Sequence, residues 1–391
     1  MEVAFCNPVR FRFVYRTDMR IGVPKEVKNH EQRVGLTPTS VRELVAHGHE
    51  VLVETNAGIG IGADDAAYRS AGATIATSAT AIFDTAEMIV KVKEPQAVER
   101  AMLHAGQTLF AYLHLAPDAA QTHDLINSGA TCIAYETVTD HHGGLPLLAP
   151  MSKVAGRMSI QAAAHALEAP AGGAGLLLGG VPGVAPAKVV VIGGGVVGEN
   201  AIEMAVGLGA DVTVLDRSLA VLDRLSARFG ASLRTIYSTQ SALEEYVIDA
   251  DVVIGAVLVK GARAPKLVTA EMVRRMRTGS VLVDVAIDQG GAFETSHATT
   301  HADPTYVVDG VVHYCVANMP GAVPKTSTYA LNNSTLPFAL VLADKGVRQA
   351  LADDPHLRNG LNVAKGQVTE MAVAEAFGLP FADPADVINQ L

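Results

Sequence analysis

Cysteine is scarce in this 391-residue sequence. The three cysteines, Cys6, Cys132 and Cys315, show neither the paired spacing of a disulfide framework nor a zinc-ligand pattern. Because intracellular proteins keep their few thiols reduced, the sequence indicates a cytoplasmic location.

Long apolar runs and a surplus of positive charge are also missing. No run of about 18 apolar residues is free of glycine, proline and charge, so no membrane-spanning helix is indicated. The formal net charge of −10 argues against nucleic acid or an anionic membrane as a partner.

Residues 1–18 lack the features of a signal peptide. Basic residues interrupt their apolar positions, and no small-residue cleavage site follows. A better strand begins at Met19. We therefore interpret residues 1–18 as a non-native or upstream-start extension.

Apolar residues and glycine are abundant, with 49% hydrophobic residues, 18% charged residues and 36 glycines. A chain of this length and composition is typical of two domains with large cores, and it can also bury surface in an oligomer. Before residue 146, apolar runs alternate with helical patterns, which predicts a parallel α/β sheet. The strands are expected to start near residues 19, 50, 88, 108 and 131, and a helix is expected at Ala119–Ser128.

A dinucleotide-binding pattern begins only at residue 188. The apolar run Val189–Ile192 is typical of a parallel strand buried on both faces, and Gly193, Gly195 and Gly198 follow it in a G-x-G-x-x-G spacing. The first glycine permits a tight turn, the second lets the backbone approach a pyrophosphate, and the third allows close helix–strand packing. A helix that starts here points its first N–H groups at the phosphates.

Asp216 ends the next apolar strand, about 20 residues beyond the glycines. A carboxylate at this place hydrogen-bonds the ribose 2′-hydroxyl and repels a 2′-phosphate, which favours NAD over NADP. The neighbouring Arg217 counts slightly against that preference. The alternative is a glycine-rich turn in another α/β protein, but the order of strand, helix, strand and acid favours the nucleotide site.

Two long helical segments flank the nucleotide-binding pattern. One starts near Leu148, with Ser152 as its expected N-cap, and the other starts at Pro324. Between them, further buried strands are expected near residues 251–259 and 280–288, and one last strand starts near residue 305.

This order predicts an α/β protein in which a Rossmann-type NAD-binding domain is inserted into a second, Rossmann-like substrate domain. Residues 147–323 form the inserted domain, and residues 19–146 and 324–391 form the second, discontinuous one. We expect a cleft between the two lobes.

Seven motifs occur along the chain in the order "GVPKEVKNHEQRVGLTP", "KVKEP", "FAYLHLA", "LAPMSKVAGR", "GAVLVKGARAPKLV", "VDVAIDQGGAFETS" and "YCVANMPGAVPKTSTYAL". Together they resemble the motifs of the alanine dehydrogenase family, which is related to the nucleotide-binding part of proton-pumping transhydrogenase. The resemblance covers Met19 to the C-terminus. It implies a cytoplasmic enzyme, hexameric like most members of the family, that interconverts L-alanine with pyruvate and ammonium using NAD.

The resemblance also implies which residues bind the substrate. Arg33 and Lys93 match the residues that bind the substrate carboxylate, although on its own Arg33 is typical of a surface arginine. Leu148 and Met151 resemble residues that surround the alanine methyl group. A small apolar wall at this place favours a three-carbon acid.

Three further residues concern proton transfer. On its own, His114 on an apolar strand is typical of a hydrogen-bonded core histidine, but the resemblance makes it the catalytic acid/base. The resemblance makes Asp288 the group that activates ammonia or water. Asp284, four residues earlier, is the competing candidate, and we assign it a structural role.

Further cofactor contacts follow from the same resemblance. Ser152 is expected near the nicotinamide, and Ser238 near the adenine. The remaining residues of the expected cofactor site are Val196, Val197, Val257, Leu258, Val285, Ala286, Ile287, Asp288, Val316, Asn318 and Met319.

The sequence departs from the family pattern at a few positions. Gly194 and Val197 occupy the middle of the glycine motif, where the family usually carries "GAGxAG". His297 replaces an arginine that is common after "FETS". These changes concern individual cofactor contacts rather than the reaction.

No metal is predicted. Val341 and Lys345 stand where some family members carry potential metal ligands. The pair His141 and His142 is more typical of a solvent-exposed turn than of a metal site.

Three alternative functions are weighed against the alanine reaction. The histidine of "LHLA" argues against a transhydrogenase alpha-subunit-like nucleotide-binding protein, and the small methyl pocket argues against a saccharopine-type reductase. The joint presence of Arg33, Lys93, His114 and Asp288 argues against a non-enzymatic nucleotide sensor.

Overall fold

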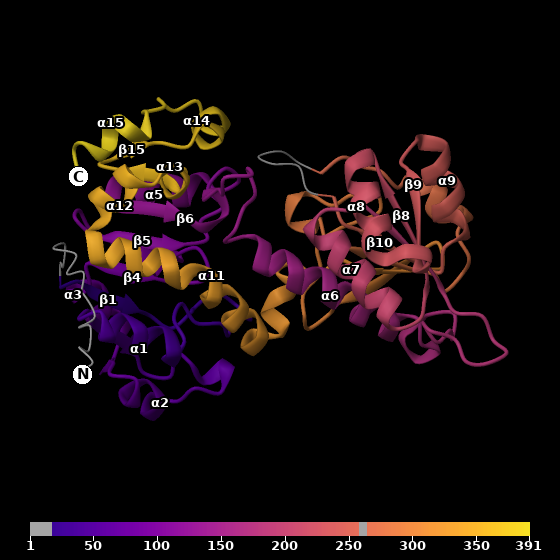
Figure 1. Cartoon of the computed structure of the whole chain (residues 1–391), viewed down its shortest axis with the longest axis horizontal. Coiled ribbons are helices and arrows are strands. Elements are labelled where there is room, and N and C mark those ends of the chain that lie inside the picture. The colour runs from indigo at the N-terminus through magenta and orange to yellow at the C-terminus, as the bar shows by residue number, and fades with distance from the viewer. Residues whose placement is uncertain (1–17, 258–263) are drawn as a thin grey trace, which may run out of the picture. The chain divides into compact units, whose positions relative to one another are not determined.

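The computed structural model describes residues 18–257 and 264–391, and the chain forms two compact units, each with its own sheet (Figure 1). The first unit contains the chain up to Lys28 together with Val34–Leu145 and Asn332–Leu391. The second unit contains Asn29–Arg33 and Pro146–Leu331.

The sheet of the first unit has eight strands in the order β15-β14-β6-β5-β4-β1-β2-β3. The strands β1 to β6 pair in parallel, as their alternation with helices predicted. The central strands β4, β5 and β6 are buried along their whole length, as expected for strands covered on both faces. The strands are Arg20–Val23 (β1), Glu50–Glu54 (β2), Thr74–Ala76 (β3), Met88–Val90 (β4), Thr108–Ala111 (β5), Thr131–Ala134 (β6), Leu361–Ala364 (β14) and Gln367–Val368 (β15).

Several helices of this unit start at an N-cap residue whose side chain accepts a hydrogen bond from a backbone N–H of the first turn. Thr37, Asp64, Ser78 and Asp118 act in this way for α1, α2, α3 and α5, and α5 has the predicted bounds. The helices are Pro38–Ala46 (α1), Ile59–Ile61 (η1), Asp65–Ser70 (α2), Ala79–Thr85 (α3), Ala97–Arg100 (α4), Ala119–Ser128 (α5), Tyr135–Thr137 (η2), Val347–Asp353 (α12), Pro355–Arg358 (α13), Met371–Phe377 (α14) and Pro384–Ile388 (α15).

The sheet of the second unit has seven strands in the order β12-β13-β11-β10-β7-β8-β9. All neighbours pair in parallel except β12 and β13. Apolar side chains of β7, β10 and β11 are buried in the core of this unit, as their continuous apolar runs predicted. The strands are Lys188–Ile192 (β7), Asp211–Asp216 (β8), Leu233–Tyr237 (β9), Val252–Gly255 (β10), Val281–Asp284 (β11), Thr305–Val308 (β12) and Val311–Tyr314 (β13).

The helices of the second unit include the one that follows the glycine motif, α7. Among the described residues of the chain, no helix is both long and apolar enough to cross a membrane. The helices are Ala149–Ala166 (α6), Ala169–Ala171 (η3), Val196–Gly207 (α7), Leu219–Phe229 (α8), Gly230–Ser232 (η4), Gln240–Asp249 (α9), Ala270–Arg275 (α10), Ile287–Gln289 (η5) and Met319–Ala322 (η6). The predicted long helix Pro324–Lys345 (α11) begins in this unit, and its residues from Asn332 onward belong to the first unit.

Two hairpins differ from the sequence prediction. The single strand predicted near residue 305 is the antiparallel pair β12 and β13, and its turn residues Asp309 and Gly310 have φ values of 50° and 80°. The C-terminal tail, predicted to be helical, contributes β14 and β15, with Lys365 and Gly366 at φ values of 51° and 74°. Two-residue turns with positive φ match the twist of paired strands and reverse the chain tightly.

The start of α6 also differs from the prediction. The N-cap is Leu148 rather than Ser152, and Pro150 lies in the first turn of the helix. Proline is well suited to this place, since the first N–H groups of a helix have no partner within it. Met151 and Ser152 therefore lie in the first turn, and their N–H groups donate to Leu148 O at 3.1 and 3.2 Å.

Candidate active site

The turn between β7 and α7 gives each glycine of the nucleotide motif a distinct environment. Gly193 has a φ of 99°, a conformation that favours glycine. A Cβ atom on Gly198 would lie 1.8 Å from the carbonyl oxygen of Gly193, so only glycine allows this close approach of helix and strand. Apart from its chain neighbours, a Cβ atom on Gly195 would meet no atom of the described residues within 4 Å. The turn thus leaves open space at the start of α7, where helix N–H groups attract phosphate, and it fits a pyrophosphate.

Asp216, at the end of β8, is tied to this turn. Its Oδ2 accepts the N–H of Gly194 at 2.7 Å, and its Oδ1 accepts the N–H of Ser218 at 2.7 Å. The N–H of Ser238, which follows β9, donates to the carbonyl oxygen of Asp216 at 2.9 Å. A carboxylate can accept about four hydrogen bonds, so Asp216 keeps the capacity to accept a ribose hydroxyl. The structure therefore brings Asp216 and Ser238 together beside the glycine turn.

The other residues of the expected cofactor site follow the carboxyl ends of neighbouring strands in the same sheet. This is the edge at which open α/β sheets bind their ligands. Val257 follows β10, and a Cβ atom added to Gly193 would lie 3.4 Å from its Cγ2. Leu258 lies outside the described residues. Val285, Ala286, Ile287 and Asp288 follow β11, and Val316, Asn318 and Met319 follow β13.

Arg33 is buried, which corrects the surface position that its own sequence context indicated. Its side chain is 1% exposed. Nε donates to Glu31 Oε1 at 2.7 Å, and Nη2 donates to Glu31 Oε2 at 2.5 Å. Nη2 also donates to Asn318 Oδ1 at 2.8 Å, and Nη1 donates to Met151 Sδ at 3.1 Å. Three residues from separate motifs, Arg33, Met151 and Asn318, thus form one cluster in the second unit.

Glu31 completes this cluster, and the sequence analysis missed it. Burial alone would raise the pKa of Glu31, but the hydrogen bonds and charge of Arg33, with a hydrogen bond from Asn318, lower this pKa to about 2. The carboxylate is therefore ionised and fixes the guanidinium by two parallel hydrogen bonds. The only sequence signal for this pairing was that Glu31 stands two residues before Arg33. Oppositely charged residues at this spacing are common on solvated surfaces.

Lys93 follows β4 in the first unit, where Glu26 holds its backbone. Glu26 Oε1 accepts the N–H of Val92 at 2.7 Å and that of Lys93 at 3.4 Å. Its other oxygen lies 3.1 Å from Nζ of Lys91, which is also 2.6 Å from Glu99. Burial alone would lower the pKa of Lys91, but the charges of Glu26 and Glu99 raise it. Lys91 is thus a buried ammonium that holds Glu26 in place.

His114 lies beyond the end of β5, not within a strand as the sequence predicted. The strand ends at Ala111, and the side chain of His114 is 44% exposed. The interpretation as a core histidine is therefore wrong. Since β4 and β5 are parallel neighbours, Lys93 and His114 both leave the sheet at its carboxyl edge.

Asp284 and Asp288 lie in opposite environments. Asp284 ends β11 and is fully buried, whereas Asp288 in η5 is exposed. Burial raises the pKa of Asp284, and hydrogen bonds from three backbone N–H groups and Ser296 oppose that rise. The donors to Asp284 are the N–H groups of Ala286, Ala292 and Phe293, at 3.1, 2.8 and 3.3 Å, and Ser296 Oγ, at 2.6 Å. Asp284 therefore shapes the loop after β11, and Asp288 is the accessible carboxylate.

His297, which replaces the arginine of the family pattern, stacks on Tyr306 with ring centroids 3.7 Å apart. Its backbone N–H donates to the Tyr306 hydroxyl at 2.9 Å. The hydroxyl in turn donates to Thr295 O at 2.9 Å. The ring of His297 therefore packs on Tyr306 of strand β12.

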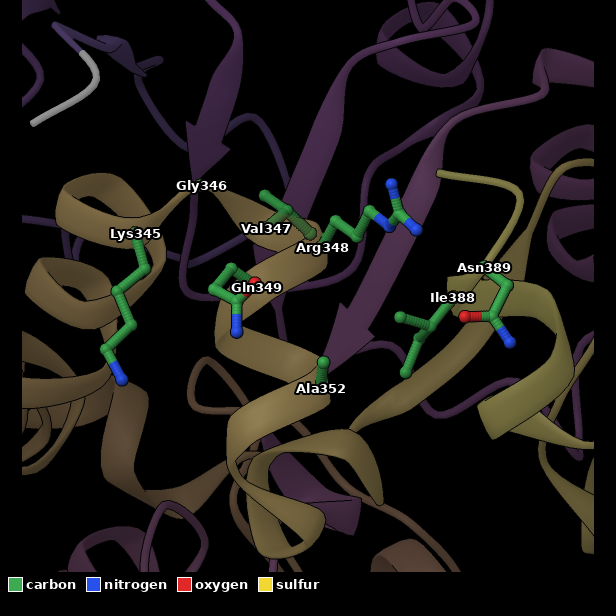
Figure 2. A pocket seen from close by; sticks show the side chains of 8 residues that line it. All are labelled: Lys345, Gly346, Val347, Arg348, Gln349, Ala352, Ile388 and Asn389. Atoms are coloured by element: carbon green, nitrogen blue, oxygen red, sulfur yellow. The ribbon is translucent and has the colours of Figure 1, made fainter. Parts of the chain in front are cut away.

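A cavity of about 520 Å³ lies in the first unit, near the start of α12 (Figure 2). Lys345 lines it, and its Nζ lies 2.6 Å from Asp353 Oδ2, so this ammonium forms an ion pair. No candidate catalytic or cofactor residue lines the cavity. The lining residues are Lys345, Gly346, Val347, Arg348, Gln349, Ala352, Ile388 and Asn389.

Comparison with protein families gives two matches that together span most of the chain. Residues 22–155 match the family described as "Alanine dehydrogenase/PNT, N-terminal domain". Residues 159–371 match "Alanine dehydrogenase/PNT, C-terminal domain".

Individual proteins and solved structures resemble the chain over nearly its whole length. An alanine dehydrogenase of Halomonas elongata is 63% identical over 371 residues, which cover 95% of this chain and all of that protein. A solved L-alanine dehydrogenase superposes with a TM-score of 0.89 at 54% identity, covering 92% of this chain and 99% of that one. A transhydrogenase from Sinorhizobium meliloti superposes with a TM-score of 0.77 at 26% identity, covering 90% of this chain and 99% of that one.

Proposed function

Because the chain belongs to the alanine dehydrogenase/PNT family, we propose roles for its candidate residues in that family's alanine reaction. The chain has alanine dehydrogenase activity. It deaminates L-alanine to pyruvate and ammonia with NAD, and it catalyses the reverse reductive amination of pyruvate. The observation that carries this conclusion is 63% identity to an alanine dehydrogenase over 371 residues, set against 26% identity to the transhydrogenase.

The turn after β7 is our proposed pyrophosphate site, with Asp216 as the ribose acceptor. The open space at Gly195 and the remaining acceptor capacity of Asp216 support this assignment. When bound, NAD supplies a hydride acceptor for the carbon that carries the amino group. Ser152, Ser238, Asn318 and the apolar residues after β10, β11 and β13 complete the proposed site.

Arg33 and Lys93 are the proposed partners of the substrate carboxylate. The paired hydrogen bonds from Glu31 support this role for Arg33, because they fix the orientation of the guanidinium before substrate arrives. Met151 contacts Arg33, and Leu148 is the N-cap of the helix that carries Met151. We assign both to the wall that limits the size of the substrate side chain beside its carboxylate.

His114 and Asp288 are the proposed proton-transfer groups. In reductive amination, an imidazolium at His114 gives a proton to the substrate oxygen, and the neutral ring takes it back in the reverse direction. Asp288 removes a proton from attacking ammonia, or from water in deamination. The exposure of both side chains supports this assignment, since a group that exchanges protons with substrate must be accessible.

Steady-state kinetics test the proposed function directly. The purified chain should oxidise NADH only when pyruvate and ammonium are both present, and it should reduce NAD with L-alanine. Hydride exchange between NADH and an NADP analogue, without any need for alanine or pyruvate, would instead favour the transhydrogenase alternative.

We also propose a cytoplasmic homo-oligomer, a hexamer by resemblance to the family. The buried thiols of Cys132 and Cys315, which are unpaired, support a reducing compartment. Assembly is supported by apolar side chains exposed in the second unit, where Leu177, Val181 and Val184 are 66%, 53% and 63% exposed. Light scattering of the purified chain measures the assembly, and a monomeric mass would contradict it.

A further inference from the structure

The backbone at His114 adopts a conformation that other residues must stabilise. Its φ is 49°, in the left-handed region. For a residue other than glycine this conformation is unfavourable, and it is found where surrounding contacts hold it. His114 lies three residues past the end of β5, and its side chain is exposed.

Glu136 makes the contacts that hold this turn. It lies in η2, directly after β6, the parallel neighbour of β5. Its Oε1 accepts the N–H of His114 at 2.5 Å, and both its oxygens accept the N–H of Leu113 at 3.2 Å. On the other side of the turn, Gln121 Nε2 donates to the carbonyl oxygen of Leu113 at 2.5 Å. The peptide unit before His114 is thus fixed from both sides.

The same carboxylate also faces the imidazole ring. Glu136 Oε1 lies 3.8 Å from His114 Nδ1, with the Glu136 side chain only 14% exposed. This separation allows a strong charge interaction, and catalytic contacts of this kind often shorten when substrate binds. A carboxylate beside Nδ1 favours the tautomer with its proton on Nδ1, which leaves Nε2 to exchange protons with a substrate.

We propose that Glu136 is the positioning residue of His114: it fixes the left-handed turn that presents the ring, and it stabilises the imidazolium through Nδ1. This inference rests on the proposed acid/base role of His114. Glu136 acts through His114 and needs no contact with substrate. No sequence motif indicated this role, since the two residues are 22 positions apart.

Two other titratable side chains bear on this pair. The ring of Tyr112, one residue past the end of β5, lies parallel to that of His114 with centroids 5.7 Å apart. Glu370, which precedes α14, lies close enough to Glu136 for their charges to repel. Burial raises the pKa of Glu370, and the charge of Glu136 adds to that rise. Glu370 therefore serves as the control position: it is a carboxylate near Glu136, but it makes none of the contacts with His114 described above.

The decisive variant is Glu136→Gln, because its amide oxygen can still accept the two backbone N–H groups while the charge is lost. We expect kcat to fall about 10–100-fold, as it does when the partner that orients a metal-binding histidine is removed, with little change in the KM for NADH. The midpoint of the pH–rate profile for alanine oxidation should move to lower pH, because a neighbouring negative charge that favours the protonated form of a base is lost. In Glu370→Gln the midpoint should move by less than half as much.

The length of the side chain gives a second measurement. Glu136→Asp keeps the charge but withdraws it by one methylene, so its kcat should lie between those of the unsubstituted chain and Glu136→Gln. If Glu136→Gln fails to fold, as judged by circular dichroism and assembly size, a Glu136→Asp variant with full turnover and an unchanged profile overturns the inference. An unshifted profile in folded Glu136→Gln overturns it as well.

A double variant separates this inference from the role of His114 itself. If Glu136 acts through His114, adding Glu136→Gln to His114→Ala should lower kcat no further. A further tenfold loss in the double variant would show that Glu136 acts elsewhere. If His114→Ala alone keeps near-normal turnover, the acid/base role of His114 fails first, whatever Glu136 does.

Discussion

Glu31 and Arg33 form a buried ion pair in which Nε and Nη2 of the guanidinium each meet one carboxylate oxygen, at 2.7 and 2.5 Å. Asn318 bridges the two side chains by accepting from Arg33 and donating to Glu31 Oε2 at 3.1 Å. A planar guanidinium fits this arrangement, whereas an ammonium cannot make the paired contacts. The pair therefore fixes the orientation of Arg33.

The geometry of this pair predicts the effect of Arg33→Lys. We expect the KM for pyruvate to rise at least about tenfold, since a lysine keeps the charge but loses the orientation. The KM for NADH should change little. Initial rates with varied pyruvate and varied NADH measure both constants, and the exposed Arg42→Lys serves as the control. An unchanged pyruvate KM would remove Arg33 from the carboxylate site.

Glu31 also predicts how stability depends on pH. Its folded-state pKa of about 2 lies below the ordinary value of 4.5, so the ionised form stabilises the fold fully above pH 4.5. This stabilisation, on the order of 3 kcal/mol, is lost as the pH falls from 4.5 towards 2. Denaturant midpoints between pH 7 and pH 3 should therefore fall less steeply in Glu31→Gln than in the unchanged chain. The control Glu43→Gln, on the exposed face of α1, should keep the original slope, and equal slopes in all three would contradict the assignment.

Asp216 sets the proposed cofactor choice. Asp216→Ala removes the repulsion of a 2′-phosphate and lets the adjacent Arg217 pair with it, so the ratio of kcat/KM for NADPH over NADH should rise. NADH binding should weaken as well, because Gly194 and Ser218 lose their acceptor. Kinetics with both cofactors measure the ratio. Asp211→Ala, at the opposite end of β8, should leave it unchanged, and the same ratio in both variants would sink the assignment.

Asp288 and Asp284 should respond differently to the same substitution. Asp288→Asn should lower kcat by about 10²–10⁴-fold while NADH still binds, because a proton acceptor is lost. Asp284→Asn should lower kcat much less, but it should lower the melting temperature. Its amide NH₂ would face N–H donors, which costs about 1–3 kcal/mol. Fluorescence titration with NADH, turnover and thermal melts distinguish the two, and a dead Asp284→Asn beside an active Asp288→Asn would reverse our roles.

Much of the second unit could be predicted from neighbouring residues. The run Val189–Ile192, the spaced glycines and Asp216 specify strand, turn, helix and strand within about 30 residues. Such a unit is visible in the sequence because its periodicity and its backbone requirements are local. The helices α5 and α11 were likewise predicted from local patterns.

The candidate catalytic residues depended instead on contacts between distant parts of the chain. The partner of Arg33, Asn318, lies 285 positions away, and the C-terminal strand β14 joins β6 across more than 200 residues. The left-handed turn at His114 depends on Glu136 from the next strand. The sequence by itself determined the nucleotide turn and the order of the elements, because these depend on local periodicity and backbone freedom. Only the tertiary structure decided that Arg33 is buried, that His114 is exposed, and that Asp288 rather than Asp284 is accessible, because burial and pairing are set by residues that meet only after folding.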